Sequence, residues 1–162
     1  MLYNFCTKNL RVNQLLYLSF SIMLLYGCSS NSSNLDNVGI INNKLKPCPD
    51  SPNCVSSFEN NNSNSYVKPI YYSHNISLAN VVEFITNTVE NIPRVKLITR
   101  QNNYLHFEFR TFLGFVDDVE FLVDNANKTI HFRSASRIGY YDFKKNHTRY
   151  LQIKSKLTES IK

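Results

Sequence analysis

The strongest constraint on the fold is an alternation of apolar and charged residues within three consecutive segments of the chain. Such a period of two places the two sets of side chains on opposite faces of a β-sheet. One face would carry Leu105, Phe107, Phe109, Val119, Phe121, Val123, Ile130 and Phe132, and the other His106, Glu108, Arg110, Asp118, Glu120, His131 and Arg133. The sequence therefore predicts a sheet with one apolar and one charged face.

Turn-forming residues separate these segments. Gln101-Asn102-Asn103, Leu113-Gly114 and Asn125-Ala126-Asn127 each interrupt the alternation. Connections this short favour an antiparallel meander. We predict strands over 95–100, 104–111, 115–123 and 129–137, with a further short strand over 67–72.

Two helices are predicted to cover the apolar face. Ser77 can cap a helix over 78–91, in which apolar residues recur at helical spacing until Pro93. Asp142 can cap a second helix, whose apolar stripe would hold Phe143, His147, Tyr150, Ile153, Leu157 and Ile161. The expected fold is α+β, a four- to five-stranded antiparallel meander sheet with two helices packed on one face. Its expected order is strand, helix, four strands, helix.

The N-terminal residues have the pattern of a secretion signal. Lys8 and Arg11 precede an apolar run over 12–26, which is shorter than the roughly 20 residues that cross a bilayer. The run ends in a segment that resembles the bacterial lipobox at Leu25, Gly27 and Cys28 and departs from it at the bulky residue between Leu25 and Gly27. We expect a lipoprotein signal peptide over 1–27 and acyl chains such as palmitate on Cys28.

The mature chain is expected to consist of a tether and one domain. Residues 28–46, rich in Asn and Ser, are too polar to offset the entropy of ordering and predict a flexible tether. Residues 47–162 can bury one modest core and predict a single α+β domain. The anchor would hold this domain on a membrane of the cell envelope, facing the periplasm. Ser29 is not the Asp that retains such proteins at the inner membrane, so the outer membrane is favoured in a two-membrane bacterium.

The charge balance restricts the partner only in part. The chain has 18 basic and 12 acidic residues, and loss of Lys8 and Arg11 with the signal leaves a net charge of +4. These basic residues are scattered, which together with an envelope location argues against a nucleic-acid partner. An envelope protein, a glycan and an anionic small molecule remain open. The histidines are not spaced as metal ligands and Gly-rich loops are absent, so we expect no metal and no cofactor.

Cys48 and Cys54 are the cysteines of the predicted domain. An exported location is oxidising, so a disulfide is the main expectation. A metal site and a redox-active dithiol remain alternatives, although the spacing offers neither a second ligand pair nor a Cys-x-x-Cys motif. Prolines around the two cysteines exclude a helix and a central strand, and we predict an ordered loop over 46–57, called the stapled loop below.

Three motifs give the chain a family resemblance. They are Cys-Pro-Asp-Ser-Pro-Asn-Cys-Val-Ser-Ser from Cys48, Phe-Val-Asp-Asp-Val-Glu-Phe from Phe115, and Arg-Ser-Ala-Ser-Arg from Arg133, continued by Gly139, Tyr140 and Asp142. With these motifs the chain resembles the bacterial and plastid family of domains of unknown function numbered 1499, over about Leu45 to Lys156. The resemblance implies an envelope or organelle location and no established activity. At the start of the last helix, His147 and Thr148 interrupt the family's basic cluster.

The charged sheet face holds the candidate catalytic residues. Arg110 is expected opposite Asp118, and Glu120 opposite Arg133. Asp118 or Glu120 could serve as a general base while Arg133 and Arg137 bind a phosphate or carboxylate. The alternative is a solvated face crossed by ion pairs.

Asp117 alternates toward the apolar side, where a carboxylate needs partners. These could be backbone amides, the hydroxyls of Ser134 and Ser136, an Arg of a neighbouring segment, or a ligand. Further candidates lie in the stapled loop, where polar residues either bind a ligand or form turns. The candidate binding residues are Asp50, Ser51, Asn53, Arg133, Arg137 and Asp142.

These residues favour a non-catalytic binding or assembly module of the cell envelope. The alternative is an envelope enzyme, for example a hydrolase, with Asp117, Asp118, Glu120 and Arg133 as its catalytic candidates. A Gly-x-Ser-x-Gly motif is absent from the sequence, which argues against a serine hydrolase.

Overall fold

The computed structural model of this protein describes residues 37–161. The predicted signal peptide and Cys28 lie outside the described residues. Within them, no helix is long and apolar enough to cross a membrane. The elements in chain order are β1 (Ile40–Ile41), β2 (Lys44–Leu45), β3 (Cys54–Ser56), β4 (Ile70–Tyr71), α2 (Leu78–Glu90), β5 (Val95–Gln101), β6 (Tyr104–Arg110), β7 (Val116–Asp124), β8 (Thr129–Ser136) and α3 (Lys145–Ser160).

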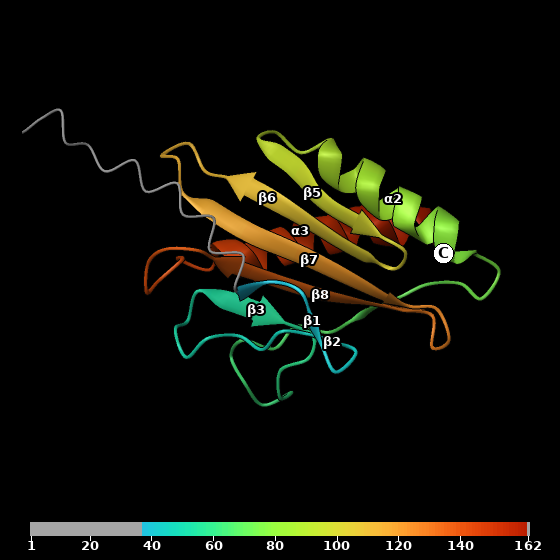
Figure 1. Cartoon of the computed structure of the whole chain (residues 1–162), viewed down its shortest axis with the longest axis horizontal. Helices are drawn as coiled ribbons and strands as arrows, with labels where there is room; N and C mark the ends of the chain where they lie inside the picture. Colours follow the sequence, from blue (N-terminus) through green and yellow to red (C-terminus); the bar gives the residue numbers. More distant parts are fainter. Residues whose placement is uncertain (1–36, 162) are drawn as a thin grey trace, which may run out of the picture. The chain divides into compact units, whose positions relative to one another are not determined.

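The main sheet is antiparallel, with the strand order β3-β8-β7-β6-β5 (Figure 1). The short strand β4 also pairs with β8, beside its first residues. The α+β fold and the meander over β5–β8 are confirmed, and each of these strands ends within one residue of its predicted limits. The strand β3 was not predicted; it lies at the edge of the sheet, where the prolines before it do not interrupt a ladder.

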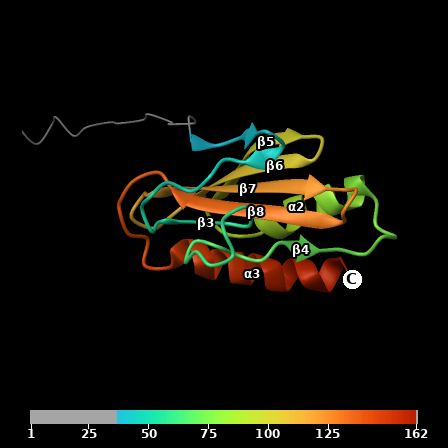
Figure 2. The same cartoon turned by 90° about the horizontal axis from the view of Figure 1, so that it is seen from below.

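Both helices pack on the apolar face of the sheet, as predicted (Figure 2). The helix α2 begins at the predicted cap, because the Ser77 hydroxyl accepts a hydrogen bond from the backbone N–H of Asn80 at 3.2 Å. The core contains all eight residues assigned to the apolar face by alternation, together with one stripe from each helix. Buried helical residues include Val81, Val82, Ile85, Val89, Tyr150, Ile153 and Leu157.

The helix α3 begins later than predicted. Phe143 and Lys144 have φ angles of 54° and 62°, in the left-handed region, so the helical turn starts only at Lys145. Asp142 still caps this end, because its carboxylate accepts hydrogen bonds from the backbone N–H groups of Lys144 at 2.9 Å and Asn146 at 2.8 Å. The predicted stripe is wrong at Phe143 and His147, which are exposed; Asn146 is buried instead.

The charged face of the sheet is buried beneath a β-hairpin formed by β1 and β2. Leu45 of this hairpin packs with Tyr104, Leu122 and the half-buried Phe58. The hairpin turn contains Asn42 and Asn43, whose φ angles of 50° and 60° suit the type I′ geometry that Asn tolerates. Residues 37–46 were assigned to the tether, and the structure corrects this boundary, because they fold against the sheet.

Candidate functional site

The acidic residues in the middle of the charged face form a closed network with basic partners. Asp118 accepts hydrogen bonds from Arg137 at 2.7 and 2.8 Å and contacts the His106 ring at 2.7 Å. Arg137 also donates to Glu108 at 2.6 Å. Asp118 and His106 are both buried, so this group contributes to the interior of the domain.

A second buried ion pair lies further along the same face. Glu120 and Arg133 are directly opposite each other, as predicted, with 2.7 Å between the carboxylate and the guanidinium. The other carboxylate oxygen of Glu120 accepts hydrogen bonds from the Tyr104 hydroxyl at 2.8 Å and from the backbone N–H of Gly39 at 2.6 Å. Burial is the main cause that raises the pKa of Tyr104, and the nearby Glu120 carboxylate raises it further. The backbone directly before β1 therefore supplies one of the hydrogen bonds to the Glu120 carboxylate.

The predicted pairing of Arg110 with Asp118 is wrong. In the structure, Arg110 lies opposite Val116, and Glu108 lies opposite Asp118. The reason is the connection between β6 and β7, where the backbone N–H of Thr111 donates to the carbonyl of Phe115 at 2.8 Å and closes a shorter loop than a pairing of Arg110 with Asp118 would require. The expected solvated face is also wrong, because Asp118, Glu120 and Arg133 are at most 3% exposed.

Acid should destabilise the fold through Asp118. Its burial alone would raise the pKa, but hydrogen bonds from Arg137 and His106 outweigh burial and hold the pKa of Asp118 below its ordinary value. The ionised carboxylate therefore stabilises the fold above its unfolded pKa of about 4, and this contribution is lost as the pH falls through the lower folded pKa. In urea unfolding at a series of pH values, the wild type should lose stability below about pH 4, and Asp118→Asn should show a shallower loss. An unchanged slope in the variant would contradict this assignment.

Asp117 belongs to a separate polar network at the start of α3. Its carboxylate accepts a hydrogen bond from Arg149 of α3 at 2.6 Å, so the predicted Arg partner from a neighbouring segment is confirmed. Arg149 also donates to the Ser134 hydroxyl at 3.0 Å and lies 4.7 Å over the ring of Phe109. Asp117 and Ser134 are buried. The carboxylate is thus neutralised on the apolar side of the sheet.

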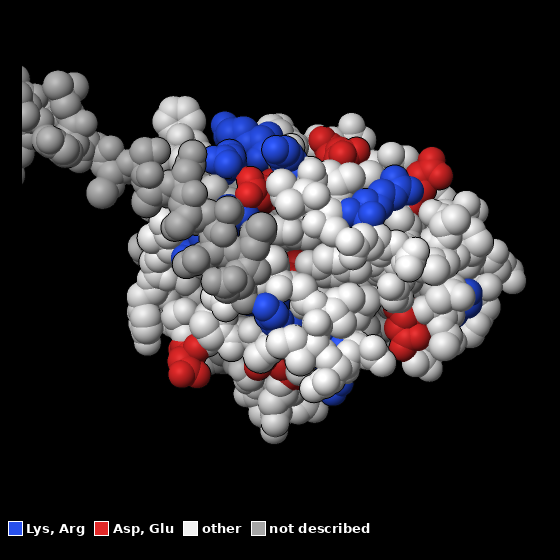
Figure 3. All heavy atoms as spheres, in the orientation of Figure 1, with Lys and Arg blue, Asp and Glu red and all other residues white. Residues whose placement is uncertain are grey.

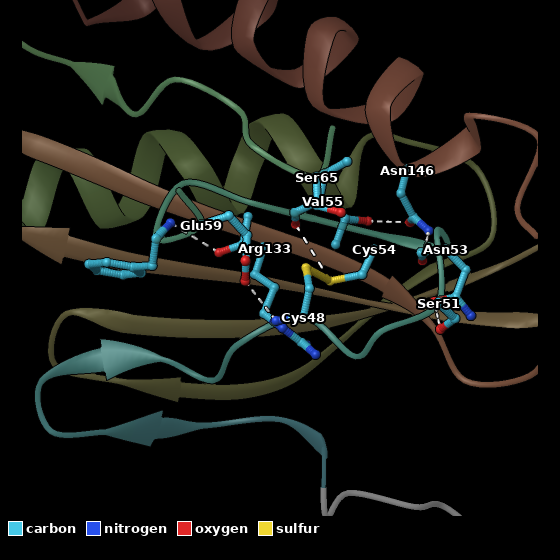
Figure 4. Close-up of a disulfide and its surroundings, with 12 residues drawn as sticks. Cys48, Ser51, Asn53, Cys54, Val55, Glu59, Ser65, Arg133 and Asn146 are labelled. Carbon is cyan, nitrogen blue, oxygen red and sulfur yellow. Dashed lines mark hydrogen bonds between the residues drawn. A yellow bond between two sulfur atoms is a disulfide. The ribbon is translucent and has the colours of Figure 1, made fainter. Parts of the chain in front are cut away.

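Asn146 links this network to the stapled loop. Its side-chain amide donates to the carbonyl of Asn53 at 2.8 Å (Figure 4). The same amide donates to the Ser136 hydroxyl at 3.1 Å, and the side-chain oxygen accepts from Ser134 and Arg149. The residue is fully buried. The sequence analysis gave Asn146 no role in the site. The pattern that could have indicated its role is its place four residues after the capping Asp142, in line with the apolar stripe of the helix, where a polar residue needs a buried partner.

The stapled loop is closed by the predicted disulfide between Cys48 and Cys54, which Figure 4 shows beside Arg133. The Ser51 hydroxyl donates to the Asn53 side chain at 2.8 Å, and Asn53 in turn donates to the carbonyl of Gly139. Ser51 and Asn53 therefore hold the loop against the segment between β8 and α3. Asp50 is exposed.

A groove of about 740 Å³ lies between the stapled loop, the start of α3 and the polar segment 59–65, called the spacer below. Its walls are formed by Pro52, Cys54, Val55, Asn64, Ser65, Tyr141, Asp142, Phe143, Lys144 and His147. Of the predicted catalytic and binding residues, only Asp142 lines it. Asn53 supports one wall from behind, whereas Asp117, Asp118, Glu120, Arg133 and Arg137 are held in the three polar groups described above.

One of three comparisons with known proteins finds a match, and it covers the two motifs that contribute to the groove walls, those beginning at Cys48 and at Arg133. The family model described as "Protein of unknown function (DUF1499)" matches residues 44–157. Neither the comparison with curated proteins nor the comparison with solved structures finds a match. The match covers the stapled loop, the whole sheet and most of α3. The chain therefore belongs to the DUF1499 family.

Proposed function

We propose that this protein is a lipid-anchored module of the cell envelope that binds a ligand in the groove beside the stapled loop. One observation carries the proposal: segments distant in the sequence are fixed around an open groove whose walls include the exposed side chains of Tyr141, Phe143 and His147. The disulfide and Asn146 hold the walls of this groove in place. Such rigid support of an exposed site is typical of binding loops on a scaffold.

The anchor is supported by the sequence. A short apolar run after Lys8 and Arg11 ends at the lipobox-like Cys28. The disulfide between Cys48 and Cys54 is in keeping with an oxidising compartment outside the cytosol. The lipobox-like segment and the disulfide together support the proposed location of the groove in the cell envelope.

Binding is favoured over catalysis by the state of the charged residues. Asp118 and Glu120 are buried and hydrogen-bonded to Arg137 and Arg133, and neither lines the groove beside the stapled loop. A general base must reach the proton that it removes, directly or through one water. These carboxylates are instead placed to neutralise buried guanidinium groups.

The groove walls favour a ligand that joins an anionic group to an apolar or ring-shaped part. Lys144 and His147 are exposed and supply the basic side. Tyr141 and Phe143 supply exposed aromatic rings, while Asn64 and Ser65 offer hydrogen-bonding groups. A phosphorylated or carboxylated envelope component has this combination of properties.

Filling the groove should remove the ligand without disturbing the fold. In native mass spectrometry of the full-length protein extracted from its membranes in mild detergent, we expect acyl chains on Cys28 and a bound ligand. Asn64→Trp places an indole in the groove and should lower ligand occupancy about tenfold or more. Asn61→Trp, at another exposed Asn of the same spacer that does not line the groove, is the matched control.

Two results would contradict the proposal. A Cys28 without lipid and with the leader intact would remove the anchor. Equal ligand occupancy in both tryptophan variants, or an empty wild-type groove in every preparation, would remove the binding site.

A further inference from the structure

Two loops at one end of the sheet expose large apolar side chains. The β6–β7 loop presents Phe112, Leu113 and Phe115, and the β8–α3 loop presents Ile138, Tyr140, Tyr141 and Phe143. Phe112 is 87% exposed and Phe143 is 90% exposed. Exposed apolar side chains gathered in this way mark an interaction surface, whereas isolated ones need no explanation. We call these seven residues the apolar tip.

The two loops of the apolar tip lie side by side. They leave the sheet from the neighbouring strands β7 and β8, and the backbone N–H of Arg137 donates to the carbonyl of Val116 at 3.0 Å, between the roots of the loops. Figures 1 and 2 both show the loops projecting beyond the same end of the sheet. The left-handed backbone of Phe143 and Lys144 belongs to the same projecting segment.

Exposed basic residues flank the apolar tip. Arg94 and Arg110 are adjacent on the ends of β5 and β6, where the N–H of Arg110 donates to the carbonyl of Arg94 at 2.9 Å. Lys144 and Lys145 follow the β8–α3 loop. Figure 3 shows basic side chains gathered over the end of β6, next to uncharged surface. Asp142, the carboxylate within the β8–α3 loop, is already hydrogen-bonded to the start of α3.

We propose that the apolar tip and its flanking basic residues dock on the surface of a bilayer that contains anionic lipids. Tyr and Phe suit the interface between headgroups and acyl chains, and Lys and Arg beside them attract anionic headgroups. The inference rests on the proposed envelope location and deepens it, because the groove shares Tyr141, Phe143 and Lys144 with the docking surface. The groove then opens at the level of the headgroups.

The short length of chain between the proposed anchor and the domain agrees with this orientation. The chain from Cys28 to Asn37 can span at most about 30 Å, so a lipidated Cys28 holds the domain close to the bilayer. The strand β1 begins near the end of the sheet that carries the apolar tip, as both cartoons show. Anchor and tip can therefore engage one membrane surface together.

Single tryptophans can test this contact, because the chain has no natural tryptophan. The full-length protein carrying Phe112→Trp or Phe143→Trp is reconstituted with vesicles of phosphatidylglycerol and brominated phosphatidylcholine. Its fluorescence should shift to the blue and be quenched by the bromine atoms. Tyr71→Trp is the matched control, because Tyr71 is also exposed but lies on β4, beside the opposite end of the sheet. Its emission should stay unquenched.

Charge reversal tests the role of the anionic lipids. In the Phe143→Trp protein, Lys145→Glu should remove about half of the quenching or more, while Lys156→Glu near the other end of α3 should leave it unchanged.

Quenching that is absent, or equal at positions 71, 112 and 143, would overturn the docking surface. A blue shift that grows with protein concentration and occurs without bromine quenching would assign the tip to a second copy of the chain and would also overturn the proposal. Lipid on Cys28 and ligand in the groove are measured separately by mass, so failure of this contact is distinct from failure of the proposed function.

Discussion

Glu120→Ala should lower the free energy of unfolding by about 3–5 kcal/mol, because it leaves the buried guanidinium of Arg133 without its counterion. Arg133 donates to Glu120 at 2.7 Å and is almost wholly buried, and its Nε already lacks a hydrogen-bond partner. The same change removes the acceptor of the Tyr104 hydroxyl and of the Gly39 N–H. Since a domain of this kind is stable by about 5–15 kcal/mol, the variant should be close to unfolding. Urea unfolding at neutral pH measures the loss.

Two comparison variants separate a buried pair from a surface pair. Replacing both partners, with Glu120→Leu and Arg133→Met, should restore most of the lost stability, because no buried charge is then left unpaired. Arg110→Ala breaks an ion pair whose Arg is more than half exposed and should cost at most about 1 kcal/mol. If Glu120→Ala cost no more than Arg110→Ala, the charged face would be solvated and the role of the β1–β2 hairpin as its cover would be refuted.

Asn146→Ala should lower the free energy of unfolding by about 2–4 kcal/mol, because several buried or half-buried polar groups each lose one hydrogen bond together. The Asn53 carbonyl and the Ser134 and Ser136 hydroxyls all bond to this side chain. Asn146→Asp keeps the oxygen that accepts from Arg149 but loses both amide donors, so it should be intermediate. Thr148→Ala, an exposed change on the same helix, is the control and should change the stability by less than about 0.5 kcal/mol.

Asn146→Ala should also weaken ligand binding in the groove. Asn146 holds the stapled loop against α3, so its loss should reduce ligand occupancy in native mass spectrometry even at temperatures where the protein stays folded. If Asn146→Ala and Thr148→Ala were equally stable and bound the ligand equally, the polar network at the start of α3 would have no part in building the site.

The fold could be predicted from local patterns, and the burial of the charged face could not. Alternation assigned Val119 and Phe121 to one face and Asp118 and Glu120 to the other, and both assignments are confirmed. Alternation with a period of two indicates which residues share a face of the sheet, but it carries no information on what covers that face. The cover comes from residues 37–46, whose Asn-rich composition resembles a tether. The dipeptide Asn42-Asn43, between Ile40-Ile41 and Lys44-Leu45, indicates a hairpin, but this pattern is too short to outweigh that composition.

The candidate site was predicted in its motifs but not in its geometry. The pairing of β6 with β7 differs by two residues from the expected register. Arg110 therefore lies opposite Val116 and not opposite Asp118. The groove depends on the left-handed backbone at Phe143 and Lys144, which turns an expected helical turn into an exposed loop. Neither residue type favours that conformation, so the sequence gives no local signal for it. The local hydrogen bonds of Asp142 to the N–H groups of Lys144 and Asn146, together with the tertiary contacts of Asn146 with Asn53 and Ser134, hold this backbone in place instead.

Hydrogen exchange of the full-length protein most directly tests the claim that function resides at the end of the sheet where the groove and the apolar tip meet. The amide exchange rates would be compared between the protein in its own envelope membranes and the protein in detergent. Slower exchange in the membrane, concentrated over 111–115 and 137–147, is the expected result. Slower exchange confined to the β1–β2 hairpin, or identical exchange in both states, would contradict the account.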